Sequence, residues 1–190
     1  MSALCYYQGS LDYNLDQTST ESAINEMQEF LNAYPDSERA KNISQLVDEL
    51  SYKLEFKAYE NARQYFKMAE YKAATISFEN MLHDFPSTKL KPKVYDYIMQ
   101  AKSELAINSV YDLKKDRLDN AIAFSRQVEK EYPDTNSSKQ AISLREKMLK
   151  EKEKHEALTK QVEARKAEIM EKQKKEELKL KEKEQAKTNS

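Results

Sequence analysis

The chain has 190 residues, 34% of them charged, and its 32 basic residues nearly balance its 33 acidic ones for a formal net charge of −1. It therefore lacks both the basic excess that favours nucleic acid binding and the acidic excess typical of a solvating tail. With one glycine and four prolines there is little turn material for β-hairpins, so we expect an all-α fold.

One phrase of fifteen residues occurs three times, beginning at Ala23, Ala74 and Ala121. Each copy carries apolar residues at helical spacing and ends on an aromatic residue, a proline and, two residues after the proline, a serine or threonine. Proline ends a helix because it lacks the backbone N–H, and the polar residues after it are good caps for the next helix. A phrase repeated in this way predicts an array of helical hairpins that resembles a tetratricopeptide repeat protein.

In chain order, we expect one hairpin in each of the ranges 2–36, 37–87 and 88–134, followed by a capping helix. The expected helices span 2–13, 21–34, 37–68, 72–84, 89–113, 119–132 and 137 to about 180. The helix at 37–68 is long for a repeat, but nothing inside it breaks a helix and its apolar residues follow steps of three and four. The inner turn of the third hairpin is expected at 114–119.

Near residue 149 the composition changes to alternating blocks of lysine and glutamate. Pairs three or four residues apart support a solvated helix by a few tenths of a kcal/mol each, on the order of 0.3. We therefore assign 1–148 to the repeat array and 149–190 to a charged tail, helical or partly disordered, that frays by Lys181. A thin apolar stripe of Met148, Leu158, Val162 and Ile169 leaves open a helix that lies on a partner or a membrane surface, or one that forms a coiled-coil oligomer.

The tetratricopeptide pattern also indicates which side chains pack the repeats. A small residue is needed where two helices of a hairpin cross, and the phrase supplies alanine there. The expected repeat-packing residues are Ala23, Pro35, Tyr65, Ala74, Phe78, Pro86, Ala121 and Pro133. The first and third copies depart from the pattern at its phenylalanine position, which is occupied by Met27 and Ser125.

Stacked hairpins form a solenoid whose concave surface is lined mainly by the first helix of each hairpin. On this pattern we expect exposed, partner-binding side chains at Tyr59, Arg63, Lys67 and Lys114. Phe56 and Phe66 also fall on this face, where they are either core between repeats or part of the groove. The basic groups favour a partner that presents carboxylates.

No catalytic constellation emerges from the sequence. The two histidines, His83 and His155, are far apart, and the single cysteine, Cys5, excludes both an internal disulfide and a cysteine-rich zinc site. One glycine is too few for a phosphate-binding loop. We expect a protein that is not an enzyme and needs no metal or cofactor.

Residues 3–135 resemble the BamD family, the tetratricopeptide lipoproteins of the bacterial outer-membrane β-barrel assembly machinery. The resemblance is carried by a CYY helix, the LDQTSTESAI loop, the FLNAYPDSERA turn, and the long helix that leads into LEFKAYENARQYFKMAEYKAA. The wording LDQTSTESAINEMQEF is similar to the Bacteroidetes branch of the family.

The resemblance implies a scaffold at the periplasmic face of the outer membrane. Its implied partners are the POTRA domains of a BamA-like barrel subunit, other lipoproteins of the assembly complex, and unfolded outer-membrane proteins. The balanced charge predicts no nucleic acid partner. A generic tetratricopeptide adaptor outside barrel assembly is the alternative.

The family begins with a lipoprotein signal, a lipidated cysteine and further repeats, whereas Met1 to Tyr7 has neither a basic start nor an apolar run. No stretch approaches the roughly 20 apolar residues of a membrane span. We therefore expect this sequence to correspond to the C-terminal portion of the family's array, with a lipid anchor outside it. We also expect self-association through an exposed first helix.

Overall fold

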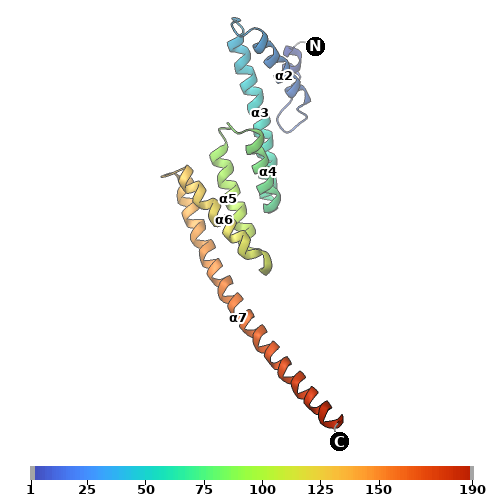
Figure 1. Cartoon of the computed structure of the whole chain (residues 1–190). Coiled ribbons are helices and arrows are strands. Elements are labelled where there is room, and N and C mark those ends of the chain that lie inside the picture. The colour runs from blue at the N-terminus through green and yellow to red at the C-terminus, as the bar shows by residue number, and fades with distance from the viewer. Residues whose placement is uncertain (1–2, 189–190) are drawn as a thin grey trace.

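The computed structural model describes the backbone of residues 3–188 and the side chains of residues 3–177 and 179. The described residues form seven α-helices and no strand: α1 (Ala3–Gln8), α2 (Thr18–Ala33), α3 (Ala40–Lys67), α4 (Tyr71–Asp84), α5 (Lys91–Ile107), α6 (Tyr111–Glu131) and α7 (Asn136–Thr188). Each helix packs on the next one in the chain, and α5 also packs on α3 and α7 (Figure 1). The predicted all-α, tetratricopeptide-like solenoid of helical hairpins is thus confirmed.

The end of each phrase stops a helix and is followed by a turn that a side-chain hydroxyl group holds. Tyr34, Phe85 and Tyr132 are the residues at which α2, α4 and α6 end. The hydroxyl oxygen two residues after each proline then accepts a backbone N–H. Ser37 accepts from Arg39 at 3.3 Å, Thr88 from Leu90 at 3.1 Å, and Thr135 from Ser138 at 3.2 Å. Of the three, Thr135 is the helix cap, because it directly precedes α7. Ser37 and Thr88 instead hold the turns before α3 and α5, whose N-cap residues Arg39 and Leu90 make no side-chain cap hydrogen bond.

The crossing points of the hairpins are closed by the first part of each phrase. Ala23 and Ala74 are 0% exposed and Ala121 is 2% exposed. The residues four positions later, Met27, Phe78 and Ser125, lie on the same helix face and are also buried. The prediction that Pro35, Pro86 and Pro133 pack the repeats is not met, because all three are exposed at the surface just after the ends of helices. The prediction that Tyr65 packs the repeats is wrong, because its side chain is 43% exposed.

The long helix α3 is continuous, as predicted, and belongs to two hairpins at once. Its first half packs on α2 through Val47 and Leu50, which share a core cluster with Met27. Its second half packs on α4 and α5 through Tyr59 and Ala62. The extra turns therefore connect two cores with one rigid rod (Figure 1).

The first helix is shorter than the range 2–13 predicted from the sequence. It ends at Gln8, where Gly9 turns the chain into a loop. Gln17 fixes this loop from inside: its side chain is buried and donates to the carbonyls of Asp12 at 2.8 Å and Leu15 at 3.1 Å. The residues after Gln8, which we expected to continue the helix, instead form a polar loop that is held by the buried side-chain amide of Gln17.

The inner turn of the third hairpin also differs from the prediction. It lies at 108–110 rather than 114–119, so α5 ends earlier and α6 begins earlier than expected. Asn108 donates its side-chain amide to the carbonyl of Glu104, and the Ser109 hydroxyl donates to Leu105. These local hydrogen bonds compete with continuation of the helix and end it.

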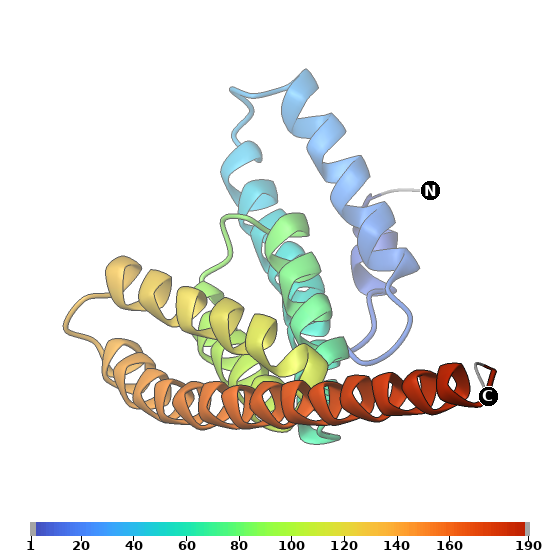
Figure 2. The same cartoon turned by 60° about the horizontal axis from the view of Figure 1, so that its bottom comes forward.

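The last helix, α7, lies beside α6 and then runs past the other helices (Figure 2). It contributes Ala141 and Met148 to the core, both 0% exposed. The helix continues to Thr188, beyond the point near Lys181 where we expected fraying.

Candidate protein-binding groove

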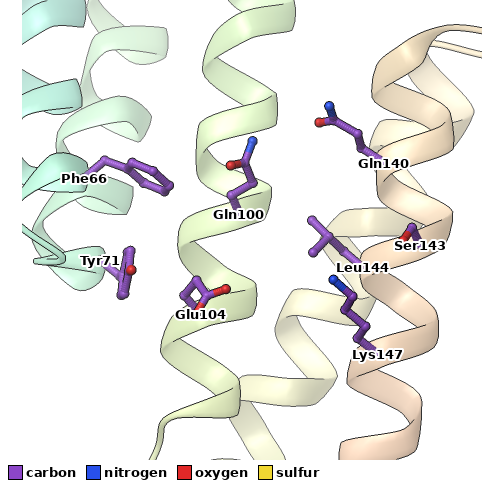
Figure 3. Close-up of a pocket in the computed structure, with 8 residues that line it drawn as sticks. All are labelled: Phe66, Tyr71, Gln100, Glu104, Gln140, Ser143, Leu144 and Lys147. Atoms are coloured by element: carbon purple, nitrogen blue, oxygen red, sulfur yellow. The ribbon is translucent and has the colours of Figure 1, made fainter.

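A groove lies between the first helices of successive hairpins, with α5 as its floor and α3 and α7 as its sides (Figure 3). Its cavity has a volume of about 410 Å³. The lining side chains are Phe66, Tyr71, Gln100, Glu104, Gln140, Ser143, Leu144 and Lys147. This is the arrangement expected of a solenoid, in which first helices line the concave side.

Aromatic side chains build the α3 side of the groove. The ring of Phe66 meets the edges of Tyr71 at 5.6 Å and Tyr97 at 5.0 Å between centroids. Tyr97 in turn stacks on the fully buried Phe78 at 5.4 Å. Phe66 is therefore held by the core and presents part of its ring to the groove, and this favours binding of an apolar side chain.

Opposite charges face one another across the groove. Glu104 projects from α5 and Lys147 from α7 (Figure 3). Within residues 3–177 neither side chain forms an ion pair. Both charges are thus available to a ligand, together with the amides of Gln100 and Gln140.

Three of the four predicted binding residues lie on the face of α3 that leads to this groove. Lys67 is exposed. Arg63 is half-buried and donates a hydrogen bond to Glu60 at 2.6 Å. This hydrogen bond is the main reason why the pKa of Arg63 is raised. The expected exposure of Tyr59 is wrong: it is 8% exposed, and burial raises its pKa to about 12. Tyr59 belongs to the core beneath the groove and is not available to a partner, because Tyr97 of α5 packs on it.

A comparison with known protein families gives a match over residues 1–110 to the family described as YfiO, an outer membrane lipoprotein family. The match covers more than half of the chain. The chain belongs to this family. A curated relative, the outer membrane protein assembly factor BamD of Caulobacter vibrioides, is 25% identical over 108 residues, or 57% of this chain and 35% of the relative. The chain spans about a third of that relative's length.

The part matched to the outer membrane lipoprotein family includes α1 to α5 and stops before α6. It supplies Phe66, Tyr71, Gln100 and Glu104 to the groove, whereas the α7 side lies outside the matched range. No helix in the described part of this family member is long and apolar enough to cross a membrane.

Lys114, the fourth predicted residue, lies elsewhere in this family member. Because α6 begins at Tyr111, Lys114 is in the early part of the second helix of the hairpin, where it pairs with Glu151 at 2.6 Å. The prediction placed it at the end of the first helix because the inner turn was expected too late. Lys114 holds α7 and does not face the groove at Phe66.

Several groove residues were missed by the sequence analysis. Tyr97, Gln100 and Glu104 follow steps of three and four along α5, so the helical period alone could have placed them on one face. Gln140 and Lys147 on α7 are seven residues apart and also share a face, but nothing in the sequence showed that this face meets α5. The sequence assigned that helix only a capping role, and its use as a groove side depends on how it packs on α5.

Proposed function

We propose that this chain is part of a non-catalytic scaffold of the outer-membrane β-barrel assembly complex. In this proposal it binds the periplasmic POTRA region of a BamA-like barrel subunit through its repeats, at the periplasmic face of the outer membrane. Family membership over residues 1–110 supports the assembly role. The carrying observation is the preformed groove, whose α3 and α5 residues all fall within the family match.

The chemistry of the groove suits a folded protein surface or a chain segment better than a small metabolite. It is open, and its lining includes two aromatic rings, two amides and one charge of each sign. Aromatic anchors flanked by polar groups are typical of protein interfaces. The exposed Lys67 adds positive charge beside the groove and favours a partner that presents carboxylates, whereas the charge of Arg63 is already paired with Glu60.

Charge reversal beside the groove tests this function. The double variant Lys67→Glu with Lys147→Glu should bind the purified POTRA region of the cognate barrel subunit at least about tenfold more weakly, equivalent to about 1.4 kcal/mol. The matched control is Lys115→Glu with Lys130→Glu, two exposed lysines on α6 that lie outside the groove. Helicity by circular dichroism should be the same for all three proteins.

Two results would count against the proposal. If both double variants bind the POTRA region like the wild type, the groove is not the contact surface. If the wild-type chain shows no binding to the POTRA region, the generic tetratricopeptide adaptor becomes the better hypothesis.

A further inference from the structure

One face of α3 is covered along half of its length and bare along the other half. Asp48, Tyr52, Glu55, Tyr59 and Phe66 follow steps of three, four and seven residues, so they share this face. Its C-terminal part is covered by α5 at Tyr59 and Phe66. Its N-terminal part is bare because α5 begins only at Lys91 and does not reach that far. The extra turns of α3 therefore create a helix face with no partner in the described chain.

This bare face forms one side of a second groove, separate from the groove at Phe66. The cavity has a volume of about 540 Å³ and lies between α3 and the turn that joins α4 to α5. Its lining consists of Asp48, Ser51, Tyr52, Glu55, Ser87, Lys89 and Leu90. Tyr52 is 47% exposed, and its ring stacks only loosely on Phe56, at 6.1 Å between centroids.

The charges of this second groove are not neutralised within the described chain. Asp48 and Glu55 form no ion pair with any described residue. The neighbouring lysines of α3 are directed to the α1–α2 loop, where Lys53 donates to Ser10 and Lys57 donates to the carbonyl of Leu15. The α3 side is thus acidic around an exposed phenol ring.

We propose that this second groove docks a segment of a partner protein through an arginine side chain. A guanidinium group is flat, so it stacks on the Tyr52 ring while its N–H groups reach the carboxylates of Asp48 and Glu55 on either side. Leu90 offers apolar contact to the stem of such a side chain.

The opposite side of the second groove gives the docked segment a direction. Lys89, in the α4–α5 turn, forms no ion pair with a described residue and lies across from the acidic side. A partner segment with its arginine toward Tyr52 therefore fits best when a carboxylate of the same segment faces Lys89. This polarity excludes a uniformly basic segment as the best ligand, because Lys89 repels it.

Titration of the full chain with a peptide of defined sequence tests the proposal. The probe is an acetylated and amidated pentapeptide of leucine and alanine with one central arginine, and its partner probe has citrulline in place of arginine. We expect weak binding of the arginine peptide, with Kd on the order of 1 mM, and amide shift changes confined to the region of Tyr52 and Lys89. Asp48→Asn with Glu55→Gln should weaken binding at least about fivefold, and raising the salt concentration should act in the same direction.

A matched control separates local recognition from net charge. Asp116→Asn with Glu146→Gln removes two exposed carboxylates elsewhere, from α6 and α7, and should leave peptide binding unchanged. Equal binding of the citrulline peptide, or equal weakening in the control variant, would overturn the proposal. Concentration-dependent dimerisation that is lost in the Asp48→Asn, Glu55→Gln variant would also overturn it, because a second copy would then fill the groove.

The two grooves can be tested independently. The Lys67→Glu, Lys147→Glu variant should bind the arginine peptide like the wild type, since neither lysine lines the second groove. Loss of POTRA binding and loss of peptide binding are therefore separate results.

Discussion

The two parts of α7 both contain lysine- and glutamate-rich sequence, but they have opposite roles. Up to Thr159 the helix is tied to α6 and the core: Met148 is buried, Arg145 pairs with Glu129 at 2.6 Å, and Tyr111 donates to Thr159 at 2.8 Å. Beyond Thr159 the described helix has only a pair within itself, between Lys175 and Glu171. Lysine- and glutamate-rich sequence therefore forms a helix in either setting, and contact with neighbouring helices decides whether that helix is part of the tertiary structure.

The last described contacts between α6 and α7 are made by one turn of α7 with the N-terminal end of α6. His155 donates from Nε2 to the carbonyl of Tyr111 at 3.0 Å, and the two rings lie 4.7 Å apart. The helix then continues for roughly 40 Å at about 1.5 Å per residue. The array therefore ends in a projecting rod whose stability should hardly affect that of the repeats.

The largest effect should follow from removal of an aromatic ring at the centre of the array. Phe78 is 0% exposed and contacts both Tyr59 and Tyr97. Phe78→Ala leaves a cavity that its rigid neighbours cannot fill and should lower the free energy of unfolding by about 3–5 kcal/mol. Urea denaturation measures this loss, and a loss below about 1 kcal/mol would show that the ring is not central to the core.

Two methionines of α7 test the difference between its packed part and its projecting part. Met148 is 0% exposed and Met170 is 57% exposed, although both lie on one helix. Met148→Ala should cost about 2–4 kcal/mol, whereas Met170→Ala should change the free energy of unfolding by less than about 0.5 kcal/mol. Similar losses in thermal or urea unfolding would mean that the projecting part is also packed, for example in an oligomer.

The repeated phrase made most of the fold predictable. The pattern of proline followed by serine or threonine depends only on local chemistry, so the three outer turns could be placed from the sequence. The continuity of α3 could be placed because nothing inside its range breaks a helix. The inner turns depend on weaker signals. Asn108 and Ser109 end α5 with side-chain hydrogen bonds to the preceding turn, yet the same residue types occur inside helices elsewhere, as at Asn61.

The binding surface was harder to predict because exposure depends on the neighbouring hairpin. Tyr59 and Arg63 lie one turn apart on α3, but α5 covers the first and leaves the second half-exposed. The bare face at Tyr52 has the same cause, since its exposure follows from where α5 begins. Periodicity shows which residues share a face, and it does not show how far the opposing helix extends.

A partly buried carboxyl on α5 should make stability depend on pH. Asp96 lies on α5, and its Oδ1 has no hydrogen-bond partner among the described residues. Burial raises its pKa above the ordinary 3.8, and a hydrogen bond with Ser137 offsets this only in part. The ionised form is therefore disfavoured in the folded state, so the contribution of Asp96 to stability is largest below pH 3.8 and falls as the pH rises through the raised pKa.

Asp96→Asn should consequently raise the melting temperature at pH 7 and have little effect near pH 3, because an amide keeps a hydrogen bond to Ser137 without ionising. Asp116→Asn, at an exposed position of α6, is the matched control and should show no such pH dependence. A lower melting temperature of Asp96→Asn at pH 7 would mean that the carboxylate is compensated by an attractive charge.

The smallest effect should come from the ion pair that joins α6 to α7. The hydrogen bond from Lys114 to Glu151, at 2.6 Å, lowers the pKa of that carboxyl below its ordinary 4.5. The pair therefore stabilises the fold above pH 4.5, and its contribution is lost as the pH falls through the lowered pKa. Lys114→Ala should cost less than about 1 kcal/mol at pH 7 in low salt, and less still in 0.5 M salt or at pH 3, because water and ions screen a pair near the surface. Urea unfolding of Lys114→Ala beside Lys115→Ala, its exposed neighbour, checks this, and a salt-independent loss above about 2 kcal/mol would show that the attachment of α7 depends on this single contact.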